Sequence, residues 1–478
     1  MRPLIVIDDF SRGIMDDITL PVRDGFGDCK GIDIFSEPGI LQVSQKLDPM
    51  PQADPPNNIT DGITWMVKYS KNGVLYGLGD GGSGRIYDWN NTQPGKWALA
   101  HDDVNVCWGQ GMIEYNGNLY WASNSYLGKF DGTTWIDSFR PLNFDWAWHP
   151  MVIFGDDLMI GSGRYIDKLD SSEVMRLGVL DLPEGYKIRC LAVYNNRLMI
   201  GTWRGLSIYE QPEASLFSWD GSSPSFEHVW TLKEAGIHAM IPWKNLLVVF
   251  AGVKGNIYLF NGATLQKIKS IPDRSNFFQT GYWIQTYPGA VTEYFGNLLF
   301  GISAGTSGEP KLPHGIYTLG RKSETDPLAL VGSHILSSGL DTYYAIYSIF
   351  VAGNNLFYVS YSDGNGVYKV DKLNIDSRII SGAYWESQIY EISQTDLPVP
   401  VKGVEVIAQP LASNNSITVK YKLDNASSWT TLGTITAANQ NKVLLGIKSL
   451  AKTIQIRLEF TTNPLNNYSP KISQIRIY

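Results

Sequence analysis

Two short segments have the residue types and spacing of known binding or catalytic motifs. Gly77-Leu-Gly-Asp-Gly-Gly82 fits the GxGxxG pattern of dinucleotide-binding proteins, and Gly301-Ile-Ser-Ala-Gly305 fits the GxSxG pattern of serine hydrolases. Both chemistries require a helix directly after the motif, to receive a pyrophosphate or to expose the serine on a sharp turn. The residues after Gly82 have the pattern of another strand, and Ser303 simply ends a strand-like run. We therefore expect neither a nucleotide site nor a catalytic serine.

A third segment, Phe130-Asp131-Gly-Thr-Thr-Trp135, resembles the Asp-box turn of sialidases and other propeller glycoside hydrolases. It lacks the Ser or Thr that precedes the Asp by two residues in those enzymes, and most other repeats of this chain do not echo it. Glycoside hydrolysis also needs two carboxyl groups held several Å apart, which sequence spacing cannot show. We expect a plain turn here, with Trp135 as a packing residue.

The remaining candidate ligands point to structural roles. The six histidines show no HxH or HExxH spacing, and Asp363-Gly-Asn-Gly366 lacks the downstream Glu that closes a calcium loop, so a type I′ turn is expected there. Cys29, Cys107 and Cys190 lie far apart and fit buried thiols better than a disulfide framework. The sequence thus predicts no catalytic residue, no cofactor and no metal, and a protein that is not an enzyme.

Composition fits many short strands joined by tight turns. The 478 residues include 47 Gly, 26 Tyr and 15 Trp, with only 18% charged residues. A net charge of -7 argues against binding to the phosphate backbone of nucleic acids, because such binding requires Lys and Arg. The apolar run at the start is too short for a signal peptide, and no stretch is long enough to cross a bilayer.

One unit recurs seven times: an aromatic or apolar strand, a turn rich in Asn, Gly and Asp, and then Leu followed by apolar residues. A third strand with a Gly-x-x-Tyr type of signature follows most copies, for example at 84–87, 205–209 and 255–258. Intervals of about 40 to 60 residues match a four-stranded blade. We predict an all-β chain whose residues 62–380 form a seven-bladed β-propeller, with loops at 211–225 and 304–313 projecting from one rim. The repeated leucines are Leu75, Leu119, Leu158, Leu198, Leu246, Leu298 and Leu356.

Two segments flank the repeat. Residues 1–61 have little periodicity and end in the Pro-rich stretch 48–58, which predicts an extended N-terminal arm. Residues 381–478 alternate cleanly and predict about seven strands of a β-sandwich of jelly-roll type. We expect the arm to pack on its own propeller or on an adjacent subunit, so that deleting residues 1–45 harms assembly more than folding. The apolar residues expected to carry that assembly contact are Ile5, Ile7, Phe10, Phe26 and Phe35.

The layout resembles a family of bacteriophage proteins. The opening Ile7-Asp-Asp-Phe-Ser-Arg-Gly-Ile14, followed by the segment 24–39 that ends in Pro38-Gly39, is similar to the start of tail-nozzle and tail-hub propeller proteins. Those proteins begin with a Phe-x-x-Gly arm and a Pro-Gly segment. The stretch from Trp385 to Ile472 is similar to sandwich modules that follow propellers in phage virion proteins.

This resemblance implies a non-enzymatic structural protein of a tailed-phage virion, a nozzle or hub ring around the DNA exit path that docks other tail proteins. It implies a cyclic homo-oligomer, sixfold rather than another symmetry, assembled in the host cytoplasm and located in the virion tail. Genomic DNA would pass without sequence-specific binding, and no membrane is a partner. The alternatives are a tail-tip or fibre-associated receptor- or glycan-binding protein, with threefold symmetry, and a sialidase-like glycoside hydrolase.

A structural role carries expectations for the acids. We expect Asp80, Asp131, Asp156 and Asp363 to lie in turns, where Asx side chains bond their own backbone. We expect no cluster of three arginines facing two carboxylates on the propeller axis.

Overall fold

The computed structural model describes most of the chain. The residues outside the description are 1, 20, 23, 83, 106, 108–110, 144–147, 205–212, 273–283, 305–313, 322, 324, 340–343, 354, 364, 394–396, 437–441 and 466. Within the described part the structure is β throughout, apart from a single 3-10 turn, η2 (Pro288–Ala290). The part of the chain that the structure describes holds no helix of a length and hydropathy suited to crossing a membrane.

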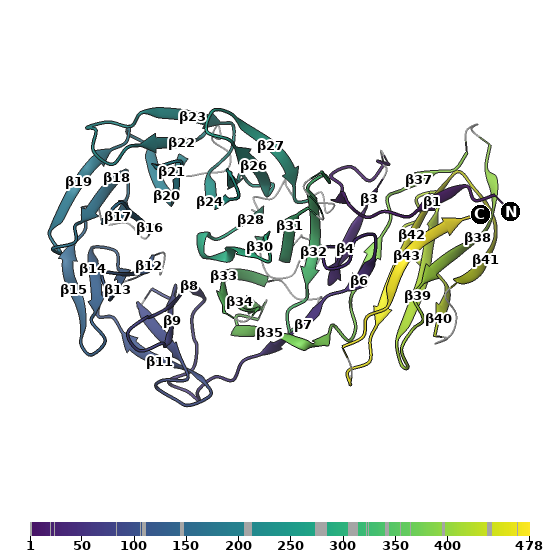
Figure 1. Ribbon diagram of the computed structural model, residues 1–478, viewed down its shortest axis with the longest axis horizontal. Helices are drawn as coiled ribbons and strands as arrows, with labels where there is room; N and C mark the ends of the chain where they lie inside the picture. The colour runs from purple at the N-terminus through teal and green to yellow at the C-terminus, as the bar shows by residue number, and fades with distance from the viewer. Residues whose placement is uncertain are drawn as a thin grey trace.

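Seven sheets, each built on antiparallel blade strands, surround a common centre, which confirms the predicted propeller (Figure 1). In each blade the chain runs from the innermost strand outward. Blades 1 and 2 consist of β8 (Ile63–Lys68), β9 (Leu75–Gly79), β10 (Arg85–Trp89) and β11 (Trp97–Asp102), then β12 (Met112–Tyr115), β13 (Asn118–Ala122), β14 (Tyr126–Phe130) and β15 (Trp135–Pro141). Blades 3 and 4 consist of β16 (Met151–Phe154), β17 (Asp157–Ser162), β18 (Tyr165–Leu169) and β19 (Met175–Asp181), then β20 (Tyr186–Tyr194), β21 (Arg197–Arg204), β22 (Ala214–Trp219) and β23 (His228–Leu232).

The last three blades depart from this pattern at two places. The inner strand of blade 6 is split, and the outer strand of blade 7 comes from the N-terminal segment. Blade 5 contains β24 (Ile237–Trp243), β25 (Leu246–Ala251), β26 (Asn256–Phe260) and β27 (Leu265–Ser270). Blade 6 contains β28 (Ile284–Gln285), β29 (Val291–Tyr294), β30 (Asn297–Ala304), β31 (Gly315–Gly320) and β32 (Ala329–His334). Blade 7 contains β33 (Tyr344–Ala352), β34 (Leu356–Asp363), β35 (Tyr368–Arg378) and β7 (Gln45–Pro49).

The predicted turn-and-leucine repeat opens the second strand of every blade. Asn116 and Gly117 have φ of 46° and 70°, as a type I′ hairpin turn requires. Leu119, which follows, is fully buried. In blade 5 the register shifts by one residue: Trp243 pairs with Leu246, and the next residue, Leu247, takes the fully buried position.

Two expectations about the outer parts of the blades change. The predicted third strand at 205–209 lies outside the described residues, and β22 is the third strand of blade 4 instead. The expected loop at 211–225 is therefore interrupted by a strand, because β22 occupies residues 214–219. The expected loop at 304–313 lies outside the described residues beyond the end of β30.

The N-terminal segment closes the propeller. Strand β7 pairs antiparallel with β35, with Leu47 opposite Leu373, and Leu47 is 1% exposed. Blade 7 thus combines three strands from the end of the repeat with one strand that precedes blade 1. The predicted boundary at residue 61 is not a domain boundary, because residues 45–49 belong to the propeller.

The remaining strands of this segment join both halves of the molecule. We call residues 2–49 the N-terminal strap. Its strands β2 (Gly13–Ile14) and β3 (Gly25–Phe26) extend blade 6 beyond β32, and Gly13 is required there because a Cβ would lie 2.3 Å from the carbonyl oxygen of Leu330. The strands that join the sandwich are β1 (Ile5–Ile7), β4 (Asp28–Lys30), β5 (Ile32–Asp33) and β6 (Leu41–Val43).

The C-terminal part is a two-sheet sandwich, as predicted. One sheet has the order β41-β38-β43-β6-β5 with β1 also paired to β43, and the other has the order β4-β36-β42-β39-β40 with β37 paired to β42. Strap strands therefore complete both sheets. The C-terminal strands are β36 (Tyr384–Glu386), β37 (Tyr390–Glu391), β38 (Val399–Ala408), β39 (Ser416–Leu423), β40 (Thr430–Ile435), β41 (Lys442–Ala451), β42 (Thr453–Thr461) and β43 (Lys471–Ile477).

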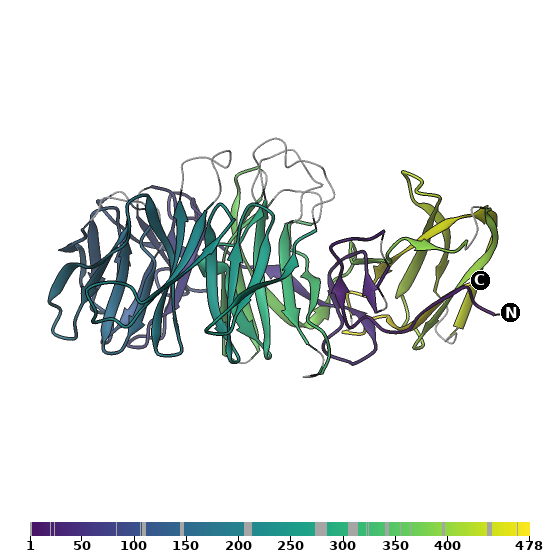
Figure 2. The same cartoon turned by 90° about the horizontal axis from the view of Figure 1, so that it is seen from above.

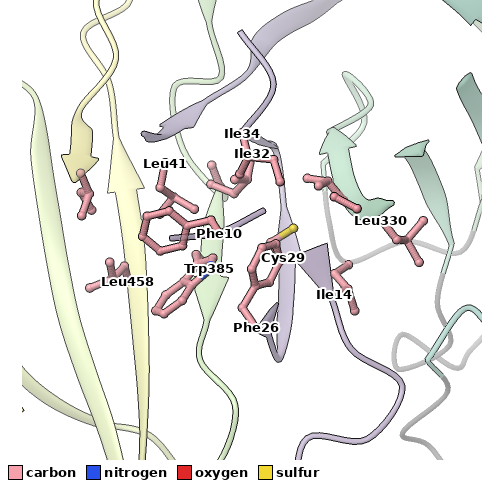
Figure 3. Close-up of a cluster of buried hydrophobic side chains, with 14 of the residues drawn as sticks. Phe10, Ile14, Phe26, Cys29, Ile32, Ile34, Leu41, Leu330, Trp385 and Leu458 are labelled. Atoms are coloured by element: carbon pink, nitrogen blue, oxygen red, sulfur yellow. The ribbon is translucent and has the colours of Figure 1, made fainter. Parts of the chain in front are cut away.

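One continuous hydrophobic core joins blades 5 and 6, the strap and the sandwich (Figure 3). Phe10 and Phe26 pack against Trp385 with ring centroids 5.8 and 6.1 Å apart, and all three side chains are fully buried. Leu330 belongs to this core from the propeller side and Leu458 from the sandwich side. Seen edge-on, the disc and the sandwich lie side by side with the strap between them (Figure 2).

This packing decides between the two expectations for the arm: it packs on its own propeller, and also on the sandwich, rather than on an adjacent subunit. Ile7, Phe10 and Phe26 are buried within the chain itself, and Ile5 and Phe35 pack against the same core, so these side chains are not a surface for an adjacent subunit. Deleting residues 1–45 would remove six strands from three sheets. We now expect that deletion to prevent folding rather than to spare it.

The shared core predicts that one strap residue controls the stability of the whole molecule. Replacing Phe10 by Ala should lower the free energy of unfolding by about 3–5 kcal/mol, because it leaves a cavity beside Trp385. Denaturant titration followed by tryptophan fluorescence and circular dichroism measures this loss. The matched control is Leu465→Ala, at a side chain 90% exposed, which should change stability by less than about 0.5 kcal/mol. A loss for Phe10→Ala as small as that of the control would contradict the shared core.

Candidate axial site

Candidate functional residues gather at one rim of the propeller. Because neighbouring strands are antiparallel, the start of each inner strand and the end of each second strand lie at the same edge of the disc. We call this edge the axial rim. Trp148 precedes β16, Arg189 lies in the first half of β20, and Tyr287 follows β28, so all three lie there. We call these three residues, together with Trp203, Gln285 and Tyr347, the axial cluster.

The interruption of the blade 6 inner strand positions Tyr287. Pro288 cannot donate to a strand ladder, and η2 separates β28 from β29 at this point. Gly289 approaches blade 1 so closely that a Cβ there would lie 2.0 Å from the carbonyl oxygen of Thr64. Only glycine fits this contact, in which the turn lies directly against β8.

Arg189 is the charged centre of the axial cluster. Its side chain is only 7% exposed, and its guanidinium lies 4.1 Å from the ring centroid of Trp148 and 5.6 Å from that of Trp203. One terminal nitrogen donates to Oε1 of Gln285 at 3.1 Å, whereas the buried Nε has no hydrogen-bond partner among the described residues. Burial lowers the pKa of Arg189 to about 10, so the group stays protonated at neutral pH.

Aromatic side chains bridge the axis between opposite blades. The ring centroids of Trp148 and Tyr287 are 6.4 Å apart, and those of Tyr287 and Tyr347 are 5.4 Å apart. Trp148 also donates its indole N–H to the backbone carbonyl of Arg189. These residues belong to the approach to blade 3 and to blades 4, 6 and 7. The propeller axis is therefore occupied by side chains at the axial rim.

Two acids of blade 1 lie at the same rim. Asp61 Oδ2 accepts a hydrogen bond from the Tyr87 hydroxyl at 2.9 Å and lies 3.4 Å from a terminal nitrogen of Arg85. Asp80 Oδ1 accepts the backbone N–H of Gly62 at 3.0 Å. Burial, together with the nearby charge of Asp61, raises the pKa of Asp80 to about 7 against that hydrogen bond.

Asp80 goes beyond the turn residue that the sequence predicts. Its side chain bonds its own backbone and also the backbone N–H of Gly62, in the segment before β8. Asp61 was not singled out in the sequence, although the pairing of β8 with β9, which brings it near Asp80, follows from the repeat itself. One arginine, Arg85, lies beside Asp61 among the described residues.

The other predicted acids divide into two groups. Asp131 accepts the backbone N–H groups of Thr133 and Thr134, both at 2.8 Å, and Asp363 accepts those of Asn365 and Val367, both at 3.0 Å. These are the predicted Asx-type turns. At Asp156 the recorded contact is to the backbone carbonyl, which accepts the Tyr115 hydroxyl at 2.6 Å. Trp135 stacks on Phe130 with centroids 3.9 Å apart, in the expected packing role.

The motif residues serve the fold. Gly79 ends β9 and a further strand begins at Arg85, so no helix follows the GxGxxG pattern. Ser303 is buried, and its hydroxyl contacts the backbone of Ile346 in the next blade, as donor at 3.2 Å and as acceptor at 2.8 Å. All three cysteines are buried thiols, and none of them forms a disulfide among the described residues. The described residues hold no group of three side chains suited to a metal ion.

No protein-family model and no curated protein matches the chain. Among solved structures, the extracellular domain of BT4673 from B. thetaiotaomicron is 13% identical with a TM-score of 0.44, over 77% of this chain and 43% of that one. This chain therefore spans less than half of that domain. The WD40 repeats of RRP9 are 11% identical with a TM-score of 0.45, over 69% of this chain and 99% of theirs. BBS1N, solved in complex with ARL6DN, is 11% identical with a TM-score of 0.41, over 70% and 98%. Likenesses this distant carry no argument about function.

The raised pKa of Asp80 predicts a pH-dependent stability difference. In the unfolded chain an Asp loses its proton near pH 3.9, whereas the folded protein keeps the Asp80 proton up to about pH 7. Stability contributed by this group therefore falls as pH rises between those values and stays low above them. Asp80→Asn keeps an acceptor for the N–H of Gly62 and removes the carboxyl group whose ionisation lowers stability. It should therefore stabilise the protein by about 1–2 kcal/mol at pH 8 and by less at pH 5. Denaturant titrations at both pH values measure this, and a difference independent of pH would contradict it.

Proposed function

We propose that this chain is a non-enzymatic structural component of a tailed-phage virion, a ring-forming nozzle or hub protein of the tail. The sequence resemblance of the opening segment and of the C-terminal module motivates the family. The structural observation that supports a load-carrying role is the strap, whose strands pair with both sandwich sheets and with blades 6 and 7.

A strap of this kind suits a part that must keep its shape. Domains joined only by a linker move relative to one another, whereas a large shared hydrophobic contact holds them together. Here Phe10, Phe26 and Trp385 belong to a core that also contains propeller and sandwich residues. The chain can therefore transmit force between neighbours that contact the disc and neighbours that contact the sandwich.

The axial cluster restricts how DNA could pass such a protein. Because Trp148, Tyr287 and Tyr347 bridge the propeller axis, the path of DNA would lie between subunits of a ring and not through the blades of one subunit. A net charge of -7 is compatible with a wall that does not retain phosphates. Cyclic symmetry generates such a ring from one repeated contact.

Electron microscopy of intact particles tests this proposal. We expect an averaged image, with the protein located by a C-terminal tag, to show six copies around the DNA path of the tail. Threefold density at a tail tip or fibre would overturn the ring proposal in favour of a receptor-binding protein. Absence of the tagged protein from purified particles would overturn the virion role altogether.

A second candidate function, glycan binding, is favoured by the axial cluster. Aromatic rings and an arginine are the side chains that recognise the faces and carboxylates of acidic sugars. Arg189 between Trp148 and Trp203, with its Nε unpartnered, has this composition. The ligand class would be a carboxylated oligosaccharide.

Binding and turnover assays separate the two candidates. The structural proposal predicts no binding and no release of sugar when the protein is incubated with sialylated, neutral and bacterial surface polysaccharides. Saturable binding that Arg189→Gln abolishes, but Arg164→Gln at a half-exposed site of blade 3 leaves intact, would favour glycan recognition. Turnover lost in Asp80→Asn would instead establish a glycoside hydrolase.

A further inference from the structure

A basic cavity lies between the strap and the outer strand of blade 5. Its volume is about 330 Å³. The strap contributes Arg12 and Met15 to its lining, and β27 contributes Gln266 to Lys269. The turn between β31 and β32 completes it with Arg321, Pro327 and Leu328. The cavity therefore exists only when the strap lies along the propeller.

Four cationic side chains line this one cavity: Arg12, Lys267, Lys269 and Arg321. Among the described residues, Arg12, Lys267 and Lys269 have no ion-pair partner within 4 Å. Asp16 is the acid that acts on Lys269, and its carboxylate accepts the backbone N–H of Ser270 at 3.4 Å. Arg12 and Lys267 therefore carry positive charge into the cavity with no ion-pair partner among the described residues, and Asp16 offsets part of the charge of Lys269.

Lys269 holds the cavity and the strap together. Its ammonium donates to the backbone carbonyls of Arg12 and Ile14 at 3.3 and 3.4 Å. Burial and the neighbouring charge of Arg12 lower the pKa of Lys269, against the attraction of Asp16. Holding these like charges close together costs electrostatic free energy, which a bound anion would recover.

We propose that this cavity binds a phosphate monoester or another doubly charged oxyanion. Guanidinium groups pair with phosphate through two parallel hydrogen bonds, and ammonium groups add point charges. Several cations favour a dianion over a single carboxylate. Met15, Ile268, Pro327 and Leu328 supply an apolar wall for a carbon skeleton. The volume lies at the lower end for small-molecule sites and suits a phosphate with a body no larger than a monosaccharide.

This site goes beyond the proposed structural role and does not depend on it. Bound phosphate would connect the strap residue Arg12 with Lys267 of blade 5 and so oppose release of the strap. A ligand that binds only the folded state stabilises a protein, and the gain grows with the logarithm of the ligand concentration above Kd. The site would therefore couple a phosphate-bearing ligand to the attachment of the N-terminal segment.

Titration calorimetry of the full-length protein tests the proposal, with inorganic phosphate and glucose 6-phosphate as probes and with acetate and chloride at equal ionic strength as references. We expect saturable binding of a phosphate probe and none of acetate. Arg12→Gln and Lys267→Gln, both at exposed side chains, should each weaken binding about tenfold. The matched control is Lys448→Gln on the sandwich strand β41, which should bind as the unchanged protein does.

Hydrogen exchange provides a second readout that does not require the variants. Phosphate should slow exchange in residues 11–16 and 265–270 together. Tighter binding of glucose 6-phosphate than of phosphate would identify an organic phosphate as the ligand class, and equal binding would identify free phosphate. Absence of saturable binding, equal binding of acetate, or unchanged affinity in both cavity variants would overturn the proposal.

Discussion

The fold depends on the backbone hydrogen bonds that the N-terminal strap makes with strands far along the chain. Strand β7 supplies the outer strand of blade 7, and Ile7 of β1 pairs with Ile475 in β43. Without these strands blade 7 would have three strands, and sandwich strands would be left as unpaired sheet edges, which favour aggregation. The propeller and the sandwich are therefore complete only together, since one segment closes both.

The two candidate sites differ in whether strap residues form part of them. The axial cluster is built by the blades alone. The interruption of the inner strand of blade 6 places Tyr287 next to Trp148, and β20 places Arg189 between two tryptophans. The basic cavity at blade 5 needs Arg12 and Met15 of the strap in place. One site is thus a property of the ring of blades, and the other reports on whether the strap is attached.

The blades could be predicted from sequence because each is a local unit with its own turn followed by a buried apolar residue, as at Asn116 to Leu119. The strap could not, because strands such as Gly13–Ile14 and Asp28–Lys30 are too short to show a period and pair with residues hundreds of positions away. Phe10 and Phe26 were recognised as apolar residues that must be covered, but composition does not say whether the same chain or another covers them. The axial cluster was missed for a related reason: Trp148, Arg189 and Tyr287 each look like ordinary packing residues until the closed ring brings them together.

Cutting the chain between β7 and β8 tests the central claim most directly. Asp54 is 92% exposed and lies in the connection between these strands, so a protease recognition sequence inserted after it should be tolerated and cleaved. If the strap is an integral part of both domains, the fragment 1–54 should stay bound to the rest of the chain in size-exclusion chromatography, and the two should separate only on unfolding. Elution of that fragment apart from a folded remainder of unchanged circular dichroism would contradict the account.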